Sequence, residues 1–302
     1  MSIWVCGEVL IDLIPGADGV RVPHVGGGPA NTAKALARLG FDAHFIDGIS
    51  TDKYGVAARK ELLDDEVKLD LALTSDKPTC LAIVSLGADG GATYEFKIDG
   101  TATFDFDLKW LPDPSRHKPS VLHIGTLVTI IEPGASVLYD WALQVAEFAP
   151  IVFDPNIRPS VMGDRDLYQA AVEKWAAISS VIKVSDDDLA WLFPDQKYED
   201  VAMRWVKDGA QLVVVTRGAN GSIGFTESGS EEAAGVKVDV VDTVGAGDTV
   251  GAIIVEAMVQ DGILSLQGEG LKKVLTRAAA AAAITCSRAG AQPPYKHELA
   301  KL

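Results

Sequence analysis

A glycine-rich turn followed by an acidic residue is the strongest candidate for chemistry in this sequence. Gly245, Ala246 and Gly247 leave the backbone almost bare, and Asp248 follows them at once. Apolar residues recur at helical spacing from Val250 onward, so the turn should open a helix. The unpaired N–H groups of a first helical turn attract anions, phosphate above all. A carboxylate there could take the proton from a hydroxyl that attacks the phosphate; an aspartate that merely caps the helix is the alternative.

The residues around this turn predict its setting. Alternation around Asp239 indicates a strand end over Val238 to Val241, and Gly262 should stop the helix. The positive end of the helix dipole should favour the ionised form of Asp248. We therefore expect a strand, a tight turn and a helix, with a charged carboxylate at the helix start.

The seven residues from Asp242 to Asp248, DTVGAGD, resemble the DTxGAGD signature of the ribokinase-like sugar kinases, the PfkB family. The resemblance implies that Asp248 is the catalytic base. It also implies that the amides of Gly245, Ala246 and Gly247 form an anion hole for the phosphoryl group that ATP donates. The use of ATP rests on this resemblance alone, because the Gly-Lys pair of a phosphate-binding P-loop never occurs.

Two stretches near the N-terminus resemble sugar-binding elements of this family. The apolar run from Ile3 to Ile14 predicts one central, buried strand, and its CGEVLIDLIP segment resembles the first strand of fructokinases, whose aspartate reaches the sugar hydroxyls. Asp12 is the matching residue, with a purely structural partner as the alternative. The stretch GGGPANTA resembles the N-terminal signature, which implies that Gly27, Gly28 and Asn31 lie against the sugar. A capped helix after a flexible loop is the alternative there.

A third stretch, DPNIRP, begins at the end of a predicted buried strand over Ile151 to Asp154. Ligands bind at the carboxyl ends of strands in α/β sheets. The stretch resembles the DPNxR element of fructokinases and 2-keto-3-deoxygluconate kinases, which implies that Arg158 clamps the sugar or the moving phosphate. A structural salt bridge between Arg158 and Asp154 is the alternative.

The nucleotide site is expected at two later strand ends. The stretch TRGANGS, at the end of a predicted strand over residues 211–216, resembles the TxGxxG nucleotide loop of the family. The residues expected at ATP are Lys183, Ser185, Thr216, Gly218, Ala219 and Gly221. Asp188 stands where most of the family has a glutamate linked to Mg²⁺ through water. Because residues 186–188 are all acidic, they also make a good first helical turn.

Ions complete the expected site. The stretch SRAGAQPP, around Gly290, resembles the loop that holds a monovalent cation in relatives together with the DT of the signature. Asp242 and Val244 would then be ligands of that cation. The resemblance therefore implies ATP, Mg²⁺ and K⁺ as the cofactors.

Composition limits the class of partner. The 302 residues carry a net charge of −15, which argues against nucleic acid and anionic membranes as partners. Cys6, Cys80 and Cys286 lack metal spacing and indicate reduced thiols. No apolar run reaches membrane-spanning length, and no basic prefix indicates a targeting signal. We expect a cytoplasmic protein whose partners are a small-molecule sugar and ATP.

Strands and helices alternate along the chain, which predicts a doubly wound α/β fold with a mostly parallel sheet flanked by helices. The resemblance implies one ribokinase-like domain over residues 1–302. It also implies a small β lid over the sugar, from about 13–24 and 76–106, through which a homodimer is possible in relatives. Phe96 or Phe104 could close over the sugar, with a core or dimer contact as the alternative.

Among substrates, fructose leads, because GEVLIDLIP, GGGPANTA and DPNIRP together resemble fructokinases. The product would be fructose 6-phosphate. The alternatives are 2-keto-3-deoxygluconate, whose carboxylate needs a basic partner, and a nucleoside or another sugar of the family. Lys97 is the one basic candidate in the hairpin, and strand alternation places it opposite Phe96. A sugar-binding regulator without activity is disfavoured by the intact Asp248 turn.

Overall fold

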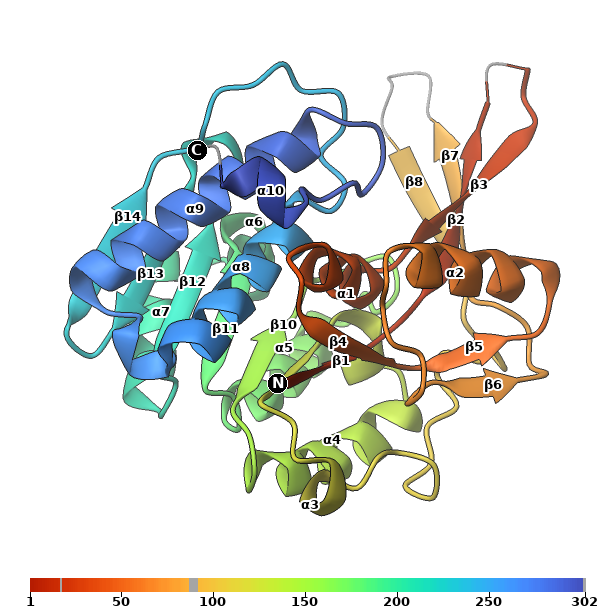
Figure 1. Ribbon diagram of the computed structural model, residues 1–302, viewed down its shortest axis with the longest axis horizontal. Helices are drawn as coiled ribbons and strands as arrows, with labels where there is room; N and C mark the ends of the chain where they lie inside the picture. The colour runs from red at the N-terminus through yellow and green to blue at the C-terminus, as the bar shows by residue number, and fades with distance from the viewer. Residues whose placement is uncertain (17, 87–91, 301–302) are drawn as a thin grey trace.

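A computed structural model describes residues 1–16, 18–86 and 92–300, and an eight-stranded sheet runs through it (Figure 1). In spatial order its strands are β14 (Gly229–Ala233), β13 (Ser222–Thr226), β12 (Leu212–Thr216), β11 (Val181–Ser185), β10 (Ile151–Asp154), β9 (Val121–Gly125), β1 (Ser2–Cys6) and β4 (Asp42–Ile46). The strands from β12 to β4 are parallel to one another, while β13 and β14 add antiparallel pairs at one edge. The predicted mostly parallel sheet is confirmed.

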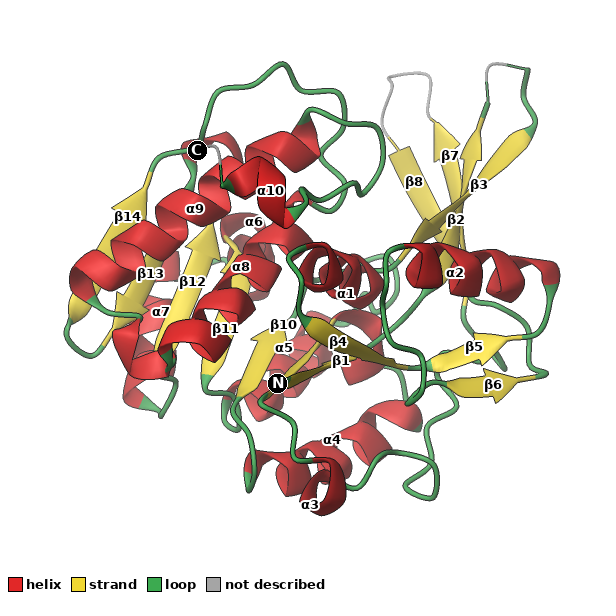
Figure 2. Cartoon of the chain, in the orientation of Figure 1, coloured by secondary structure: helices red, strands yellow, loops and turns green. Residues whose placement is uncertain are grey.

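Helices cover both faces of this sheet (Figure 2). The helices on one face are α4 (Gly134–Ala146), α5 (Arg165–Ala176), α6 (Asp186–Leu192) and α7 (Tyr198–Lys207), and those on the other are α1 (Gly28–Arg38), α2 (Lys53–Asp64), α8 (Ala246–Asp261) and α9 (Gly268–Cys286). In β1, Trp4 and Cys6 pack in the first layer, and Ile3 and Val5 in the second. This burial on both faces explains why the central strands are continuous apolar runs.

A second, four-stranded sheet lies beside the main one in the order β3 (Arg21–Gly26), β2 (Leu10–Pro15), β7 (Leu81–Leu86) and β8 (Ala92–Lys97) (Figure 1). The predicted small sheet is present, but its strands begin at Leu10 and end at Lys97. The expected single strand from Ile3 to Ile14 is wrong, because the chain leaves the main sheet after Cys6. Gly7 permits this departure: its φ is 150°, and a Cβ there would lie 2.2 Å from Pro29 Cγ.

The remaining elements are short: β5 (Gly48–Ser50), β6 (Leu73–Ser75), α3 (Pro114–His117) and α10 (Lys296–Leu299). The strand end expected over Val238 to Val241 is also wrong. The N–H groups of Val241 and Asp242 donate to the carbonyl of Cys286 at the end of α9, and no strand pairs with this segment in the described part of the chain. Helix α8 nevertheless begins and ends where the glycines predicted.

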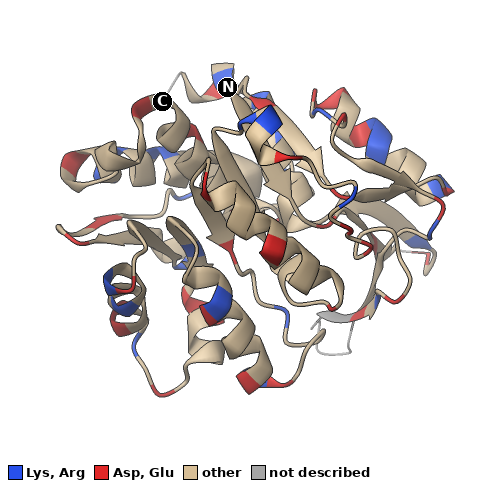
Figure 3. Cartoon of the chain, turned by 90° about the horizontal axis from the view of Figure 1, so that it is seen from below, with Lys and Arg blue, Asp and Glu red and all other residues tan. Residues whose placement is uncertain are grey.

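Charged residues of both signs are spread over the helices and loops around the sheets (Figure 3). Cys6 and Cys80 are buried, Cys286 is partly exposed, and all three are free thiols, as predicted. Among the helices of the described ranges, none is long and apolar enough to cross a membrane.

Candidate active site

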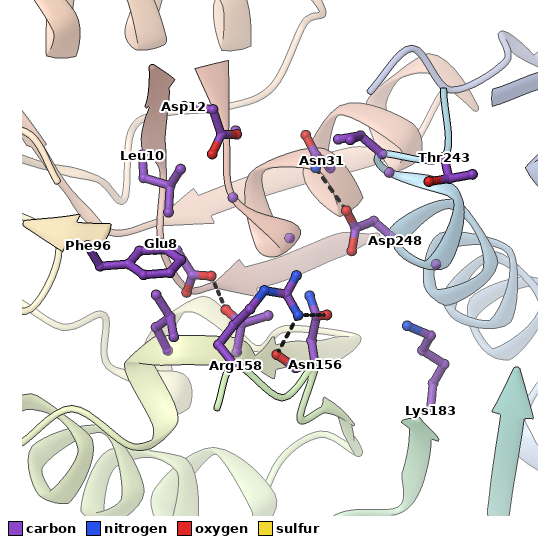
Figure 4. A pocket seen from close by; sticks show the side chains of 18 residues that line it. Glu8, Leu10, Asp12, Asn31, Phe96, Asn156, Arg158, Lys183, Thr243 and Asp248 are labelled. Carbon is purple, nitrogen blue, oxygen red and sulfur yellow. Dashed lines mark hydrogen bonds between the residues drawn. The ribbon is translucent and has the colours of Figure 1, made fainter. Parts of the chain in front are cut away.

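A cavity of about 380 Å³ lies between the carboxyl ends of the central strands and the small sheet (Figure 4). Thr126 and Asn156 enter it from the ends of β9 and β10, and Lys183 enters from β11. Asp12 on β2 and Phe96 on β8 line it from the small sheet. Ligands of open α/β sheets bind at this edge, so the fold brings the predicted residues to the expected place.

Asp248 lines this cavity from the first turn of α8. Gly245, the residue before the helix, has a left-handed φ of 79°, and a Cβ on it would lie 2.8 Å from the Cβ of Ala291. Only glycine fits between the turn and that neighbour without strain. Gly245 and Gly247 line the cavity beside Asp248, whereas Ala246 is not among its described lining residues.

The environment of Asp248 changes its acidity. The side chain is buried, and Asn31 Nδ2 donates a hydrogen bond of 2.8 Å to Oδ2. Burial raises the pKa of Asp248 to about 6, although the positive charge of Lys183 opposes the rise. The net shift is upward because burial penalises the charged form, and a carboxyl with a pKa of about 6 is still mostly ionised at neutral pH. A pKa near neutral pH suits a general base.

Lys183 stands between β10 and the glycine turn. Its Nζ lies 2.8 Å from Asp154 Oδ2, and a Cβ on Gly247 would lie 2.9 Å from the same nitrogen. Burial lowers the pKa of Lys183, but Asp154 and Asp248 together raise it above its ordinary value, so the ammonium stays charged. The alternative of a salt bridge between Arg158 and Asp154 is therefore wrong, because Lys183 is the partner of Asp154.

Arg158 reaches the cavity by folding back over its own loop. Its Nη1 donates to the Asn156 side-chain oxygen at 2.7 Å, and to the carbonyls of Asn156 and Ile157 at 3.1 and 3.0 Å. Asn156 has a φ of 39°, a left-handed conformation that asparagine tolerates. The DPNIRP loop thus presents an amide and a guanidinium to the same space (Figure 4).

Asp12 faces the cavity from the strand pair β2 and β3. A Cβ on Gly26 would lie 2.2 Å from Asp12 Oδ2, so the carboxylate rests where a larger residue would stand. Burial raises the pKa of Asp12 to about 6, while Arg158 and His24 oppose the rise. Asp12 therefore lies in the small sheet, at the site, and not within the central strand that the sequence analysis assigned to it.

Gly27 and Gly28 allow two close approaches. A Cβ on Gly27 would lie 2.3 Å from the carbonyl oxygen of Glu8. A Cβ on Gly28 would lie 2.9 Å from Asn156 Nδ2 and 3.2 Å from Asp248 Oδ1. The glycines thus bring the start of α1, with Asn31, against the carboxyl that α8 supplies.

Glu8 and Thr126 are cavity residues that the sequence analysis missed. The Glu8 side chain is buried and accepts a hydrogen bond from the Thr126 hydroxyl, while its Oε2 has no partner among the described residues. Thr126 has a φ of 60°, which is rare for a β-branched residue. Burial raises the pKa of Glu8 to about 7. The signal was present, because Glu8 interrupts the apolar run as Asp12 does, and a buried charge must be paired or functional.

The other residues expected at ATP lie together at the carboxyl ends of β11 and β12 and in the turn that follows β12. Ser185 and Thr216 pair in register across β11 and β12, and residues 218–221 turn directly after β12. A Cβ on Gly221 would lie 2.0 Å from the Ala233 carbonyl oxygen, so this turn needs glycine. Gly218 and Ala219 belong to the same turn. None of this group is among the described lining residues of the cavity, which Lys183 alone of the expected ATP residues joins.

Both carboxylate oxygens of Asp188 accept hydrogen bonds from backbone N–H groups. Its Oδ1 accepts from the N–H of Ile157 at 3.1 Å, and its Oδ2 from the N–H of Ser185 at 3.5 Å. The Ser185 hydroxyl accepts from the N–H of Asp188 in return, which completes a capping box at the start of α6. Asp188 therefore ties the DPNIRP loop to α6, and its link to Mg²⁺ stays a prediction.

The two loops predicted to share a monovalent cation meet at Asp242. Its Oδ1 accepts from the N–H of Val244 at 3.0 Å, and its Oδ2 from the N–H of Gly290 at 2.9 Å. Carboxylate oxygens accept more than one contact, so Asp242 can offer a negatively charged oxygen ligand while it holds both loops. Such a ligand fits a hard monovalent cation. No group of three or more His, Cys, Asp or Glu suited to a metal ion occurs in the described ranges.

Comparisons with known proteins agree with this geometry. The pfkB family carbohydrate kinase model matches residues 2–298. The fructokinase of Rhizobium leguminosarum bv. trifolii is 35% identical over 268 residues, which cover 87% of this chain and 81% of that protein. The crystal structure of Xylella fastidiosa fructokinase with bound ATP has a TM-score of 0.91 at 25% identity, covering 99% of this chain and 97% of that one. The Vibrio cholerae O395 fructokinase bound to fructose, ADP and calcium has a TM-score of 0.87 at 26% identity, covering 99% and 98%. The chain belongs to the pfkB family and is an ATP-dependent carbohydrate kinase.

Proposed function

We propose that this kinase transfers the γ-phosphoryl group of ATP to O6 of fructose. The observation that carries the proposal is the place of Asp248, which lines the sugar-sized cavity and belongs to the glycine turn. A hydroxyl in the cavity and a phosphate on the turn would both reach its carboxyl. The Rhizobium relative named a fructokinase and the Vibrio structure with fructose and ADP support this choice of substrate.

In this proposal the sugar lies between the small sheet and the start of α1. Asp12 and Asn31 provide oxygen and amide partners for ring hydroxyls, and the ring of Phe96 covers an apolar face. Glu8 offers a further carboxyl to the same space. A site built from hydroxyl partners rejects analogues that lack those hydroxyls, because its buried polar groups are then left unpaired.

The proposed chemistry is an in-line transfer. Asp248 takes the proton from O6 as that oxygen attacks the γ-phosphorus, and the bond to the leaving ADP oxygen breaks. The amides at Gly245 and Gly247 and the Lys183 ammonium would meet the negative charge that spreads over the transferring oxygens, whereas the expected Ala246 amide donates to the Thr243 carbonyl at 3.3 Å. Mg²⁺ bound with ATP would neutralise further phosphate charge. Asp248 then releases its proton to solvent after fructose 6-phosphate leaves.

A substrate screen tests the proposal. ADP release is measured with fructose, other hexoses, 2-keto-3-deoxygluconate, ribose and nucleosides, for the wild type and for the Asp248→Asn variant. We expect fructose to give the highest kcat/KM. A different preferred sugar would overturn the substrate, and equal rates for the variant and the wild type would overturn the assignment of the base.

A further inference from the structure

Lys34 is a buried cation in α1 that the proposed reaction does not use. Its side chain is 1% exposed, and its Nζ is paired with Glu61 and lies 3.9 Å from Asp65 Oδ2. Two carboxylates, Glu61 on α2 and Asp65 at its C-terminal cap, therefore balance its charge, as a buried ammonium requires. The same Nζ also donates a hydrogen bond of 3.3 Å to the carbonyl oxygen of Ala291, in the loop that follows α9.

Arg38 contacts the same loop one helical turn later. Its Nη1 donates to the Pro293 carbonyl at 2.8 Å, and its Nη2 to the Gln292 side chain at 2.8 Å. Asp65 binds the guanidinium through both carboxylate oxygens, at 2.7 and 3.0 Å. Residues four apart lie on one helix face, so α1 fixes residues 291–293 at two points.

The fixed loop lies directly behind the glycine turn. A Cβ on Gly245 would lie 2.8 Å from the Cβ and 3.1 Å from the Cα of Ala291. Gly290, the preceding residue, donates its N–H to Asp242, which accepts the N–H of Val244 with its other oxygen. A displacement of Ala291 would therefore pass directly to the turn that begins α8.

Helix α1 also contacts Asp248, the proposed base. Asn31, three residues before Lys34, donates to the Asp248 carboxylate at 2.8 Å. One helix thus contacts the base through Asn31 and the support of the turn through Lys34. The relative place of base and turn amides is what an in-line transfer depends on, and a misplacement of about 1 Å can lower a rate by on the order of 10²-fold.

We propose that Lys34 is a positioning residue, which presses Ala291 against Gly245 and so sets the glycine turn relative to Asp248. The proposal rests on the proposed function of that turn. If Lys34 only stabilised the fold, its removal would lower the amount of folded enzyme. If it positions the turn, its removal should lower the kcat of the folded enzyme. Lys34 is not among the described residues that line the cavity, so the KM for the sugar should change little.

The test compares Lys34→Met with Lys60→Met in the full chain. Methionine keeps most of the stem and removes the ammonium, while Lys60 is an exposed lysine paired with Asp64 on α2 and serves as the matched control. We expect kcat to fall about 10- to 100-fold for Lys34→Met, with the sugar KM within about threefold of wild type. Lys60→Met should match wild type. Rates are measured with whichever sugar wild type phosphorylates fastest, so an error in the fructose assignment appears in wild type and leaves this comparison intact.

A second readout does not depend on activity. Hydrogen exchange of the peptide spanning residues 242–248 should accelerate in Lys34→Met and stay unchanged in Lys60→Met. If Lys34→Met does not fold, Ala291→Gly replaces it, because it keeps every charge and removes the methyl group that lies beside Gly245; it should lower kcat several-fold at unchanged sugar KM. Wild-type kcat in a folded variant, unchanged exchange at the turn, or a loss matched by the fraction unfolded would each overturn the proposal.

Discussion

Asn31 Nδ2 lies 2.8 Å from Asp248 Oδ2, although the two residues are 217 positions apart in the sequence. The bond joins the N-terminal glycine stretch to the DTVGAGD turn, so the motifs proposed to bind the sugar and the phosphate are held together. Thr32, the next residue, adds a hydroxyl contact of 3.5 Å to the Asp248 carbonyl. The start of α1 therefore helps to orient the proposed base, and the Asn31 hydrogen bond opposes the rise in its pKa that burial causes.

Replacing Asp248 by asparagine should leave binding largely intact and nearly abolish turnover. Asparagine keeps the size of the side chain but cannot accept the proton from the sugar hydroxyl. Loss of a general base lowers kcat by about 10² to 10⁴-fold. Calorimetry with fructose and with a non-hydrolysable ATP analogue reports binding, and ADP release reports turnover. A kcat close to wild type would remove Asp248 from the mechanism.

Replacing Asn31 by alanine should shift the pH profile of the reaction. The base must be ionised, so the rate falls as pH drops through the pKa of Asp248, which burial raises to about 6. The Asn31 hydrogen bond lowers that pKa, so its removal should raise the pKa and move the acid limb of kcat to higher pH. Asp12→Asn is the control, because it removes a carboxyl of similar pKa that does not contact Asp248. A limb that moves equally in both variants would contradict the assignment.

Glu8 should make the fold less stable at alkaline pH. Its ordinary pKa of 4.5 rises to about 7 through burial, so the folded chain binds more protons than the unfolded chain between these values. Stability then decreases as pH rises from about 4.5 to 7, by on the order of 3 kcal/mol. Arg158 opposes this rise, Asp248 adds to it, and the nearby Asp47 is also buried with a raised pKa.

Glu8→Gln removes this titration and keeps a partner for Thr126. The melting temperature of the variant should therefore fall less than that of wild type between pH 5 and pH 8. The other buried carboxyls remain in both proteins, so only the difference between the two curves belongs to Glu8. Parallel curves would show that Glu8 does not titrate in this range.

Activity should require Mg²⁺ and rise with K⁺ at fixed ionic strength. Asp242 links the two loops proposed to hold the monovalent cation, and Val244 leads into the glycine turn. A cation there would act by ordering the turn, so replacing K⁺ by tetramethylammonium should lower kcat more than KM. Asp242→Ala should lose the response to K⁺. Full rate in tetramethylammonium argues against the site, and a chelator tests Mg²⁺ separately.

The sequence predicts the main sheet well because its signal is local. Each parallel strand is a short apolar run with both faces buried, and each is followed by a helical pattern, so alternation alone gives the α/β fold. The glycine turn is also predictable from the sequence, because its glycines are recognisable there. The structure explains one of them, since only glycine fits at position 245 against Ala291. Asp12, Asn31, Arg158 and Asp248 all line one cavity, and their roles there stay predictions.

What the sequence does not reveal depends on distant contacts. The break after Cys6 arises because Gly7 lies against Pro29, which no local pattern announces. The pairing of Lys183 with Asp154 joins two strands, and it rules out the alternative in which Arg158 pairs with Asp154. The position of Asp248 at a helix start is visible in the sequence, whereas the burial that raises its pKa is not.

The last prediction concerns the choice between fructose and 2-keto-3-deoxygluconate. Three carboxyls, Glu8, Asp12 and Asp248, line the cavity with two cations, Arg158 and Lys183. A substrate that carries its own carboxylate adds a further negative charge to this set. It would compete with the phosphoryl group for the cations.

Among the described residues of the small sheet, none that lines the cavity is a lysine or an arginine. Phe96 lines it, whereas the neighbouring Lys97 is exposed and paired with Glu95, as strand alternation predicts. We therefore expect kcat/KM for fructose to exceed that for 2-keto-3-deoxygluconate when the two are measured side by side. Arg158→Gln separates the alternatives, because it should lower both values similarly if Arg158 serves the phosphoryl group. A higher value for 2-keto-3-deoxygluconate, lost selectively in Arg158→Gln, would instead identify Arg158 as the carboxylate partner and overturn the choice of fructose.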